Sequence, residues 1–295
     1  MALAAAGLRR ATPLATAALL IGVNAPDVDV FSGAFGSYAP IAFRRGWTHG
    51  VLAIAVWPVV IAAALLVFDH YSRRRRDVAA PSARAGPLLA VAAVGVVTHP
   101  ALDWLNNYGL RWLMPFDGRW FYGDAVFIID PWLWLTLGTG IWLTRRRGIP
   151  IAARQGLTLA AVYIAAMCIN ARVARNVVLD EWRAIRGGAP VSLMAGPQPV
   201  TPFRRQVIVD GGLDYETGTL DLLSRRLTLD AVILKKDTDP RVARAREAPH
   251  IRAFLVWSRF PVWTLEETSE GTRVSVSDLR FAGRGAPFVQ SVVIR

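Results

Sequence analysis

Two residues that could act together on a metal ion or a proton lie at the end of an apolar stretch. His99 and Asp103 are four residues apart and follow the apolar run from Leu88 to Val97. Residues four apart share one face of an α-helix, so helical structure would place the imidazole beside the carboxylate. We interpret this pair as half of a metal site at the mouth of a membrane bundle. Ionisable groups near membrane depth cost free energy, so their presence there indicates a function.

Three further segments place ionisable side chains beside apolar stretches. Two carboxylates follow the first stretch, one imidazole precedes the second, and two carboxylates precede the fourth. Carboxylates combined with imidazoles suit a hard or borderline divalent ion such as Zn²⁺, Mn²⁺ or Mg²⁺. The predicted metal ligands are Asp27, Asp29, His49, His99 and Asp103, and the candidate acid–base groups are Asp124 and Asp130.

A divalent ion at this position would favour hydrolysis. It lowers the pKa of a bound water to about 7 and polarises the oxygen of an ester or phosphoester. Asp27 and Asp29 are two residues apart and point to opposite sides of an extended segment, so one of them alone could bind directly. Other interpretations remain open: each histidine could be an interfacial residue, and Asp130 before Pro131 has the pattern of a helix N-cap.

Five apolar stretches are expected to carry these residues across a membrane. The clearest runs from Gly50 to Phe68 without a charge, long enough for a hydrocarbon core of about 30 Å. The others lie at about 11–25, 87–102, 131–144 and 151–170. The first could also be a secretory signal. The predicted fold class is an all-α transmembrane bundle of about five spans, followed by a small mostly-β C-terminal domain.

Arginine clusters indicate the orientation. Arg9-Arg10, Arg73 to Arg76 and Arg145 to Arg147 fall at alternate ends of successive stretches, so all three can be cytoplasmic together. Loops 24–49 and 104–130 would then lie on the outer side. The predicted ligands would converge on that one membrane face.

The last third of the chain changes character. We predict a membrane domain over 1–180, a linker over 181–202 rich in Pro and Gly, and a β-rich extracytoplasmic domain over 203–295. Glu270-Gly271 has the pattern of a hairpin turn. The expected strands are 206–210, 227–235, 251–257, 262–266, 273–278 and 288–294.

Charge and cysteine content exclude several functions. The net charge is +12, but the arginines sit in short clusters beside apolar runs, as in membrane flanks, and nucleic-acid binding is not expected. The single cysteine, Cys168, excludes an intrachain disulfide and a cysteine-based metal site. The expected partners are membrane lipids and a small or lipid-like substrate, and the oligomeric state is undetermined.

Five short motifs in order carry a family resemblance. They are Pro26-Asp27-Val28-Asp29, Arg45-Gly46-Trp47-Thr48-His49, His99-Pro100-Ala101-Leu102-Asp103-Trp104-Leu105-Asn106, Trp120-Phe121-Tyr122-Gly123-Asp124 and Asp130-Pro131-Trp132. The sequence resembles the YdjM-like bacterial inner-membrane proteins, a LexA-associated group of predicted metal-dependent hydrolases. The resemblance implies a multi-pass inner-membrane protein with a metal-dependent hydrolase site and, in longer members, a β-rich tail.

Two positions depart from that family pattern. Such proteins usually open with a Thr-His pair on a first helix and often carry a histidine where this sequence has Arg44. A start codon further upstream would account for the first difference. We predict a membrane-bound hydrolase acting at the outer face on a lipid-like or amphipathic ester or phosphoester. The alternative is a non-catalytic membrane assembly or interaction protein with a degenerate metal site.

Overall fold

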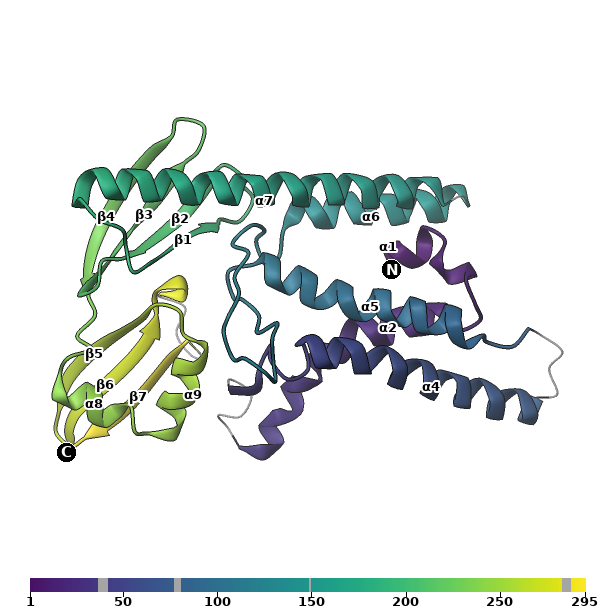
Figure 1. Ribbon diagram of the computed structural model, residues 1–295, viewed down its shortest axis with the longest axis horizontal. Coiled ribbons are helices and arrows are strands. Elements are labelled where there is room, and N and C mark those ends of the chain that lie inside the picture. The colour runs from purple at the N-terminus through teal and green to yellow at the C-terminus, as the bar shows by residue number, and fades with distance from the viewer. Residues whose placement is uncertain (37–41, 77–80, 149, 283–287) are drawn as a thin grey trace. The chain divides into compact units, whose positions relative to one another are not determined.

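The computed structural model describes residues 1–36, 42–76, 81–148, 150–282 and 288–295 (Figure 1). The chain divides into two compact units. One comprises Met1–Asp29 with Arg45–Ile169, and the other Val30–Arg44 with Asn170–Arg295. The first unit is mainly helical, and both β-sheets belong to the second.

The helical part follows the apolar stretches of the sequence. Its elements in chain order are α1 (Ala2–Ala5), the 3-10 helix η1 (Leu8–Arg10), α2 (Ala15–Asn24), the 3-10 helix η2 (Ala25–Phe35), α4 (Val51–Arg76), α5 (Ala85–Leu105), α6 (Pro131–Arg147) and α7 (Ile151–Arg186). The start of α6 has a local cause. The Asp130 side chain accepts from the backbone N–H groups of Trp132 and Leu133, and Pro131 occupies the first helical position.

Three helices among the described residues, α4, α5 and α7, are long and apolar enough to cross a membrane. The expected number of about five spans is therefore not confirmed. Helix α2 has 10 residues and follows Leu14, whose φ of 65° is left-handed. Helix α6 has 17 residues and ends at Gly148, which also has a left-handed backbone. The backbone break at Leu14 thus shortens α2 relative to the predicted stretch 11–25, whereas α6 extends three residues beyond the predicted 131–144.

Helices α2, α4 and α5 share one core, in which α5 contacts both of the others. The approach of α2 to α5 depends on two glycines. A Cβ on Gly22 would lie 2.9 Å from the Ala92 carbonyl oxygen, and one on Gly95 would lie 3.0 Å from that of Leu19. Small residues of this kind allow helix backbones to pack closely in membranes. The end of α2 is therefore held against the middle of α5.

The second unit contains two antiparallel sheets, both visible in Figure 1. The first has the order β1 (Ser192–Pro197), β2 (Arg204–Asp210), β3 (Asp214–Asp221) and β4 (Arg226–Leu234). The second has the order β5 (Pro261–Thr268), β6 (Gly271–Asp278) and β7 (Val289–Ile294). Helices α8 (Pro240–Ala245) and α9 (Pro249–Trp257) contact the second sheet. Strands β5 and β6 of this sheet form a hairpin, and its turn lies at the predicted Glu270-Gly271 position.

Helix α7 continues into this second unit. Its residues Ala174, Val178 and Trp182 pack in one apolar cluster with side chains of β1, β2 and β3. A second cluster joins the two sheets, through Ile208 of the first and Val262 of the second. The β-rich region therefore includes the end of an apolar helix.

Most of the predicted strands are confirmed, with one correction. Residues 251–257 were expected to be a strand because they are apolar, but they form α9, which begins at Pro249 in the position where proline favours a helix. The region 181–202, predicted as a linker, holds the last residues of α7 and the whole of β1. Strand β3 lies in a segment rich in Asp, Thr and Gly, for which no strand was predicted.

Candidate metal centre

Two imidazoles and two carboxylates converge on one small space in the helical unit. His99 Nε2 lies 3.5 Å from Asp27 Oδ1 and 3.4 Å from Asp103 Oδ2. His49 Nε2 lies 3.5 Å from Asp103 Oδ2 and 4.0 Å from Asp27 Oδ1. These residues come from η2, the segment before α4, and the last turns of α5. Each nitrogen thus faces both carboxylates.

Three of these facing atoms have unmet hydrogen-bonding capacity. Nε2 of His49, Nε2 of His99 and Oδ2 of Asp103 are buried and make no hydrogen bond with any residue that the structure describes. Leaving a buried polar atom without a partner costs about 1–3 kcal/mol. The residues therefore fit a divalent cation, which would give all three atoms a partner at once.

His99 is oriented by the helix crossing described above. Its Nδ1 lies 2.7 Å from the carbonyl oxygen of Val23, to which the Nδ1–H donates. This bond leaves the lone pair on Nε2, the atom that faces the carboxylates. Val23 follows Gly22 on α2, and His99 lies one turn beyond Gly95 on α5, so the close packing of the two glycines sets the length of this bond. Metal-binding histidines are commonly oriented by a backbone carbonyl in this way.

His49 is held from its other nitrogen. Its side chain is fully buried, and its Nδ1 lies 3.0 Å from Thr48 Oγ1 and 3.5 Å from Asp29 Oδ2. The backbone N–H of His49 donates to the Gly46 carbonyl, which fixes the turn before α4. With its proton on Nδ1, the imidazole presents the Nε2 lone pair to Asp27 and Asp103.

Asp29, predicted as a metal ligand, lies behind His49. It is buried, faces Nδ1 of His49, and accepts the backbone N–H of Arg45 at 2.9 Å. Its place on the side of the ring away from Nε2 suits an orienting role. Of the two neighbouring carboxylates, Asp27 is the one whose oxygen faces both Nε2 atoms.

Arg45, which the sequence places at the start of a family motif without giving it a role, is a member of the site. Its Nη2 donates to Asp103 Oδ1 at 2.8 Å, and its Nη1 donates to Asn106 Oδ1 at 3.1 Å and to the Gly109 carbonyl at 3.4 Å. Its guanidinium also lies over the ring of Tyr108. An arginine four residues before a histidine carries no metal-site pattern of its own, so only the fold reveals this contact.

The two predicted acid–base groups have different surroundings. Asp130 is buried, and its Oδ1 accepts the N–H groups of Trp132 and Leu133 while its Oδ2 accepts the hydroxyl of Tyr163. The two hydrogen bonds from backbone N–H groups are those of a helix N-cap. Asp124 has a left-handed backbone, with φ 47°. The acid–base role of both carboxylates stays a prediction.

Solvent reaches the cluster at Asp27. The side chain of Asp27 is 51% exposed, whereas those of His99 and Asp103 are 17% and 16% exposed. When Nε2 of His99 carries a proton, that imidazolium holds the pKa of the Asp27 carboxyl below its ordinary value, even though partial burial acts in the opposite direction. Asp27 is therefore the ionised group at the mouth of the cluster.

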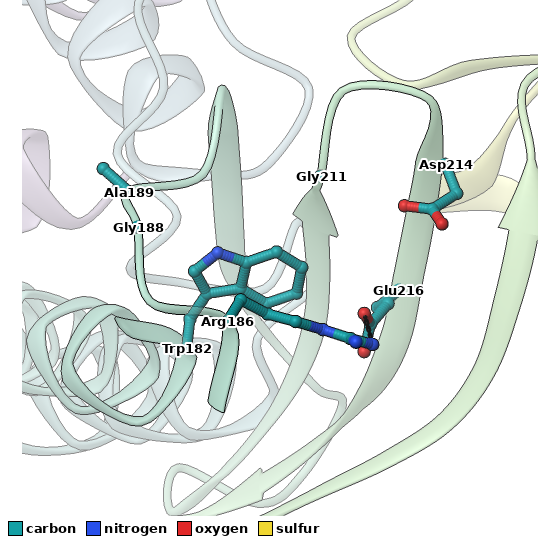
Figure 2. A pocket seen from close by; sticks show the side chains of 7 residues that line it. All are labelled: Trp182, Arg186, Gly188, Ala189, Gly211, Asp214 and Glu216. Carbon is teal, nitrogen blue, oxygen red and sulfur yellow. Dashed lines mark hydrogen bonds and ion pairs between the residues drawn. The ribbon is translucent and has the colours of Figure 1, made fainter. Parts of the chain in front are cut away.

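A second cavity, of about 290 Å³, lies in the β-rich unit between the end of α7 and β3 (Figure 2). Its lining includes Trp182, Arg186, Asp214 and Glu216. Figure 2 shows the Arg186 side chain directed at Glu216, with which it forms an ion pair, and its guanidinium lies over the Trp182 ring. The lining residues include no imidazole, and the Glu216 carboxylate is already paired with Arg186, so the chemistry is better placed in the His–Asp cluster.

Comparison with known proteins finds a family match over the helical part of the chain. The YdjM inner membrane protein family matches residues 1–177, a range that contains every predicted site residue. The uncharacterized protein YfhP of Bacillus subtilis (strain 168) is 25% identical over 283 residues, which cover 94% of this chain and 80% of YfhP. No solved structure matches the chain. Because the family match spans more than half of the chain and includes its apolar helices, this membrane protein belongs to the YdjM inner membrane protein family.

Proposed function

We propose that this protein is a metal-dependent hydrolase at the outer face of the inner membrane. Its substrate would be a lipid-like or amphipathic ester or phosphoester. The observation that carries the proposal is the set of three buried atoms, on His49, His99 and Asp103, that face one another without hydrogen-bond partners among the described residues. Two imidazoles and a carboxylate in this arrangement are a donor set that zinc and related ions accept.

The residues divide into two roles. His49, His99 and Asp103 would hold the ion, and the exposed Asp27 lies at a fourth corner that it would share with water or substrate. When bound, a divalent ion supplies Lewis acidity toward an ester or phosphoester oxygen and toward water. Asp27 is the solvent-exposed carboxylate, so its second oxygen is placed to take a proton from the attacking water and return it to the leaving group.

The position of the cluster supports a membrane-facing substrate. His49 lies at the start of α4 and Asp103 in the last turn of α5, so both are at the same end of this helix pair. The arginine run at the end of α4 lies at the opposite end, which the positive-inside rule assigns to the cytoplasm. Exposed apolar side chains also neighbour the cluster in sequence, namely Val28, Trp47 and Trp104. Such side chains suit contact with an acyl chain.

Metal content and hydrolysis measured together test the proposal. Full-length protein is purified in detergent, and its bound metals are quantified by mass spectrometry. Hydrolysis is then followed with two probes in mixed micelles, a p-nitrophenyl fatty-acyl ester and a p-nitrophenyl phosphodiester with an alkyl chain. We expect about one divalent ion per chain and turnover of one of the two probes. The His99→Ala/Asp103→Ala double variant should lose both the bound ion and the turnover.

The matched control is His70→Ala. His70 is an exposed histidine on α4, outside the cluster, so its loss should leave metal content and hydrolysis unchanged. If no divalent ion binds and the double variant retains the same hydrolysis, the enzyme assignment is wrong. The cluster would then be a structural feature of a non-catalytic membrane protein.

A further inference from the structure

We propose that Arg45 selects a four-coordinate, zinc-like ion at this centre by occupying one oxygen of Asp103. This inference rests on the proposed function, because it concerns the same metal site. It concerns Arg45 as a positioning residue, which acts on the metal through a ligand and does not touch it.

The first step is the contact itself. Arg45 Nη2 donates to Asp103 Oδ1 at 2.8 Å, while Asp103 Oδ2 faces the two Nε2 atoms. The ion pair is nearly closed to solvent, since the side chains of Arg45 and Asp103 are 8% and 16% exposed. A buried guanidinium on one oxygen of a carboxylate brings a positive charge to that side and favours binding of an ion through the other oxygen. Asp103 is thereby directed toward a single metal bond.

The second step is that Arg45 itself is firmly held. Its Nη1 donates to Asn106 Oδ1 and to the Gly109 carbonyl, and its backbone N–H donates to Asp29 Oδ2. Its backbone is left-handed, with φ 52°, a conformation that costs a non-glycine residue about 1–2 kcal/mol. Arg45 is therefore bonded to Asp103 through its side chain and to Asp29 through its backbone. These two carboxylates face opposite nitrogens of His49. The guanidinium therefore cannot swing away to release Asp103.

The third step compares the cluster with the needs of the candidate ions. Four donors at tetrahedral corners with bonds of 2.0–2.1 Å lie about 3.3–3.4 Å apart, whereas adjacent corners of an octahedron at Mg²⁺ bond lengths lie about 2.9 Å apart. The nitrogen–oxygen distances here are 3.4, 3.5, 3.5 and 4.0 Å. Two imidazoles and two single carboxylate oxygens also match the zinc preference for nitrogen ligands. Mg²⁺ and Ca²⁺ prefer shells of six to eight oxygens, whereas this cluster offers two imidazole nitrogens beside its carboxylates.

The experiment compares metals with and without Arg45. Full-length protein in detergent is stripped with a chelator, and Zn²⁺, Mn²⁺ and Mg²⁺ affinities are measured by competition titration. We expect the wild type to prefer Zn²⁺ strongly over Mn²⁺ and Mg²⁺. In Arg45→Gln, both oxygens of Asp103 become available, so Zn²⁺ affinity should fall by about 10–100-fold, the range for residues that orient ligands. The preference for Zn²⁺ over Mn²⁺ should fall by at least about tenfold.

A spectroscopic reading separates selection from folding. Co²⁺ bound to the wild type should give the intense visible absorption of four-coordinate cobalt, and Arg45→Gln should give the weak absorption of higher coordination. The control Arg119→Gln changes an arginine that is 73% exposed and paired with Asp117, so it should behave as the wild type.

Three outcomes would overturn the inference. A fall in Zn²⁺ and Mn²⁺ affinity by the same factor would show that Arg45 is only structural, as would an unchanged Co²⁺ spectrum in Arg45→Gln. Should Arg45→Gln fail to fold, Arg45→Lys keeps the charge without the paired guanidinium donors, and an unchanged metal preference there would overturn it as well. Absence of any divalent ion in the wild type would instead remove the proposed function, so the two failures are distinguishable.

Discussion

At the scale of single residues, two neighbouring aspartates receive different roles from their positions. Asp27 is half exposed and faces the Nε2 atoms of both histidines. Asp29 is buried and faces the Nδ1 atom of His49 from behind. The sequence shows two carboxylates separated by one residue, a spacing that indicates opposite directions without indicating which one points to the histidines.

We expect Asp27→Asn to separate metal binding from hydrolysis. An asparagine oxygen can still occupy the fourth corner, but the amide cannot accept a proton from water. Metal content should therefore stay near that of the wild type, while turnover of the micellar probes falls by about 10²–10⁴-fold, the usual range for general base catalysis. If Asp27→Asn lowers metal content and turnover by the same factor, Asp27 is a metal ligand and not a general base.

The β-rich unit has its own buried charge pair, which predicts an acid sensitivity. Asp278 and Arg280 are fully buried and joined by two side-chain hydrogen bonds, and Asp278 also accepts from Ser258 and from backbone N–H groups. Burial raises the pKa of Asp278, but Arg280 and the other donors outweigh it, so that the pKa lies below its ordinary value. The ionised carboxylate then stabilises the fold above the unfolded pKa of about 3.9 and loses that effect as the pH falls through the lower folded pKa.

Asp278→Asn should therefore destabilise this unit by about 3–5 kcal/mol at neutral pH, because it leaves the Arg280 charge buried without a counter-ion. Its stability should also depend less on acid pH than that of the wild type. Hydrogen exchange of β6 in the full-length protein measures both effects, with Asp237→Asn, an exposed aspartate, as the control. Wild-type protection of β6 in Asp278→Asn at neutral pH would contradict this account.

At the scale of elements, the metal centre depends on one helix crossing. Gly22 and Gly95 let α2 and α5 approach closely, and the Val23 carbonyl then meets the Nδ1 atom of His99 one turn further along. The packing of two helices thus determines the tautomer and direction of an imidazole. The same helices would hold their apolar core without this bond, so the bond is a consequence of the crossing.

Gly95→Leu should therefore impair the centre from a distance. The added side chain would push against the Leu19 backbone, at a cost of about 1–3 kcal/mol, and carry His99 away from Val23. We expect metal affinity to fall by about 10–100-fold, as for loss of an orienting partner. Gly86→Leu is the control on the same helix, because a Cβ at Gly86 meets nothing within 4 Å. Equal affinity in the two variants would contradict the crossing argument.

At the scale of the whole molecule, α7 links the membrane part to the β-rich unit. It has 36 residues and a length of about 54 Å, which exceeds the hydrocarbon thickness of about 30 Å. Its last third packs on the first sheet through residues such as Val178 and Trp182. One continuous helix therefore serves both as a candidate span and as part of the core of the following unit.

Labelling with a membrane-impermeant maleimide tests the orientation. In a Cys168→Ser background, single cysteines are introduced as Gly118→Cys in the loop after α5, Ser82→Cys between α4 and α5, and Ser224→Cys in the β-rich unit, all at exposed positions. We expect the first and third to react in intact cells and Ser82→Cys only after permeabilisation, since arginines lie on both sides of Ser82 in the sequence. Reaction of Ser82→Cys alone in intact cells would place the centre on the cytoplasmic side.

The sequence by itself determines the local features of this protein. It places the apolar helices, the adjacency of His99 and Asp103 on one helix face, the N-cap at Asp130 and most strands, because each follows from the spacing of nearby residues. It overextends the first apolar stretch, because the left-handed backbone at Leu14 is not visible in hydropathy.

The tertiary structure alone decides which distant residues meet. It brings His49 to His99, turns Asp29 behind His49, and directs Arg45 onto one oxygen of Asp103. These contacts join segments far apart in the chain, and their distances depend on how closely helices pack at Gly22 and Gly95. No local pattern encodes that packing, since it arises from the fit of one helix surface against another.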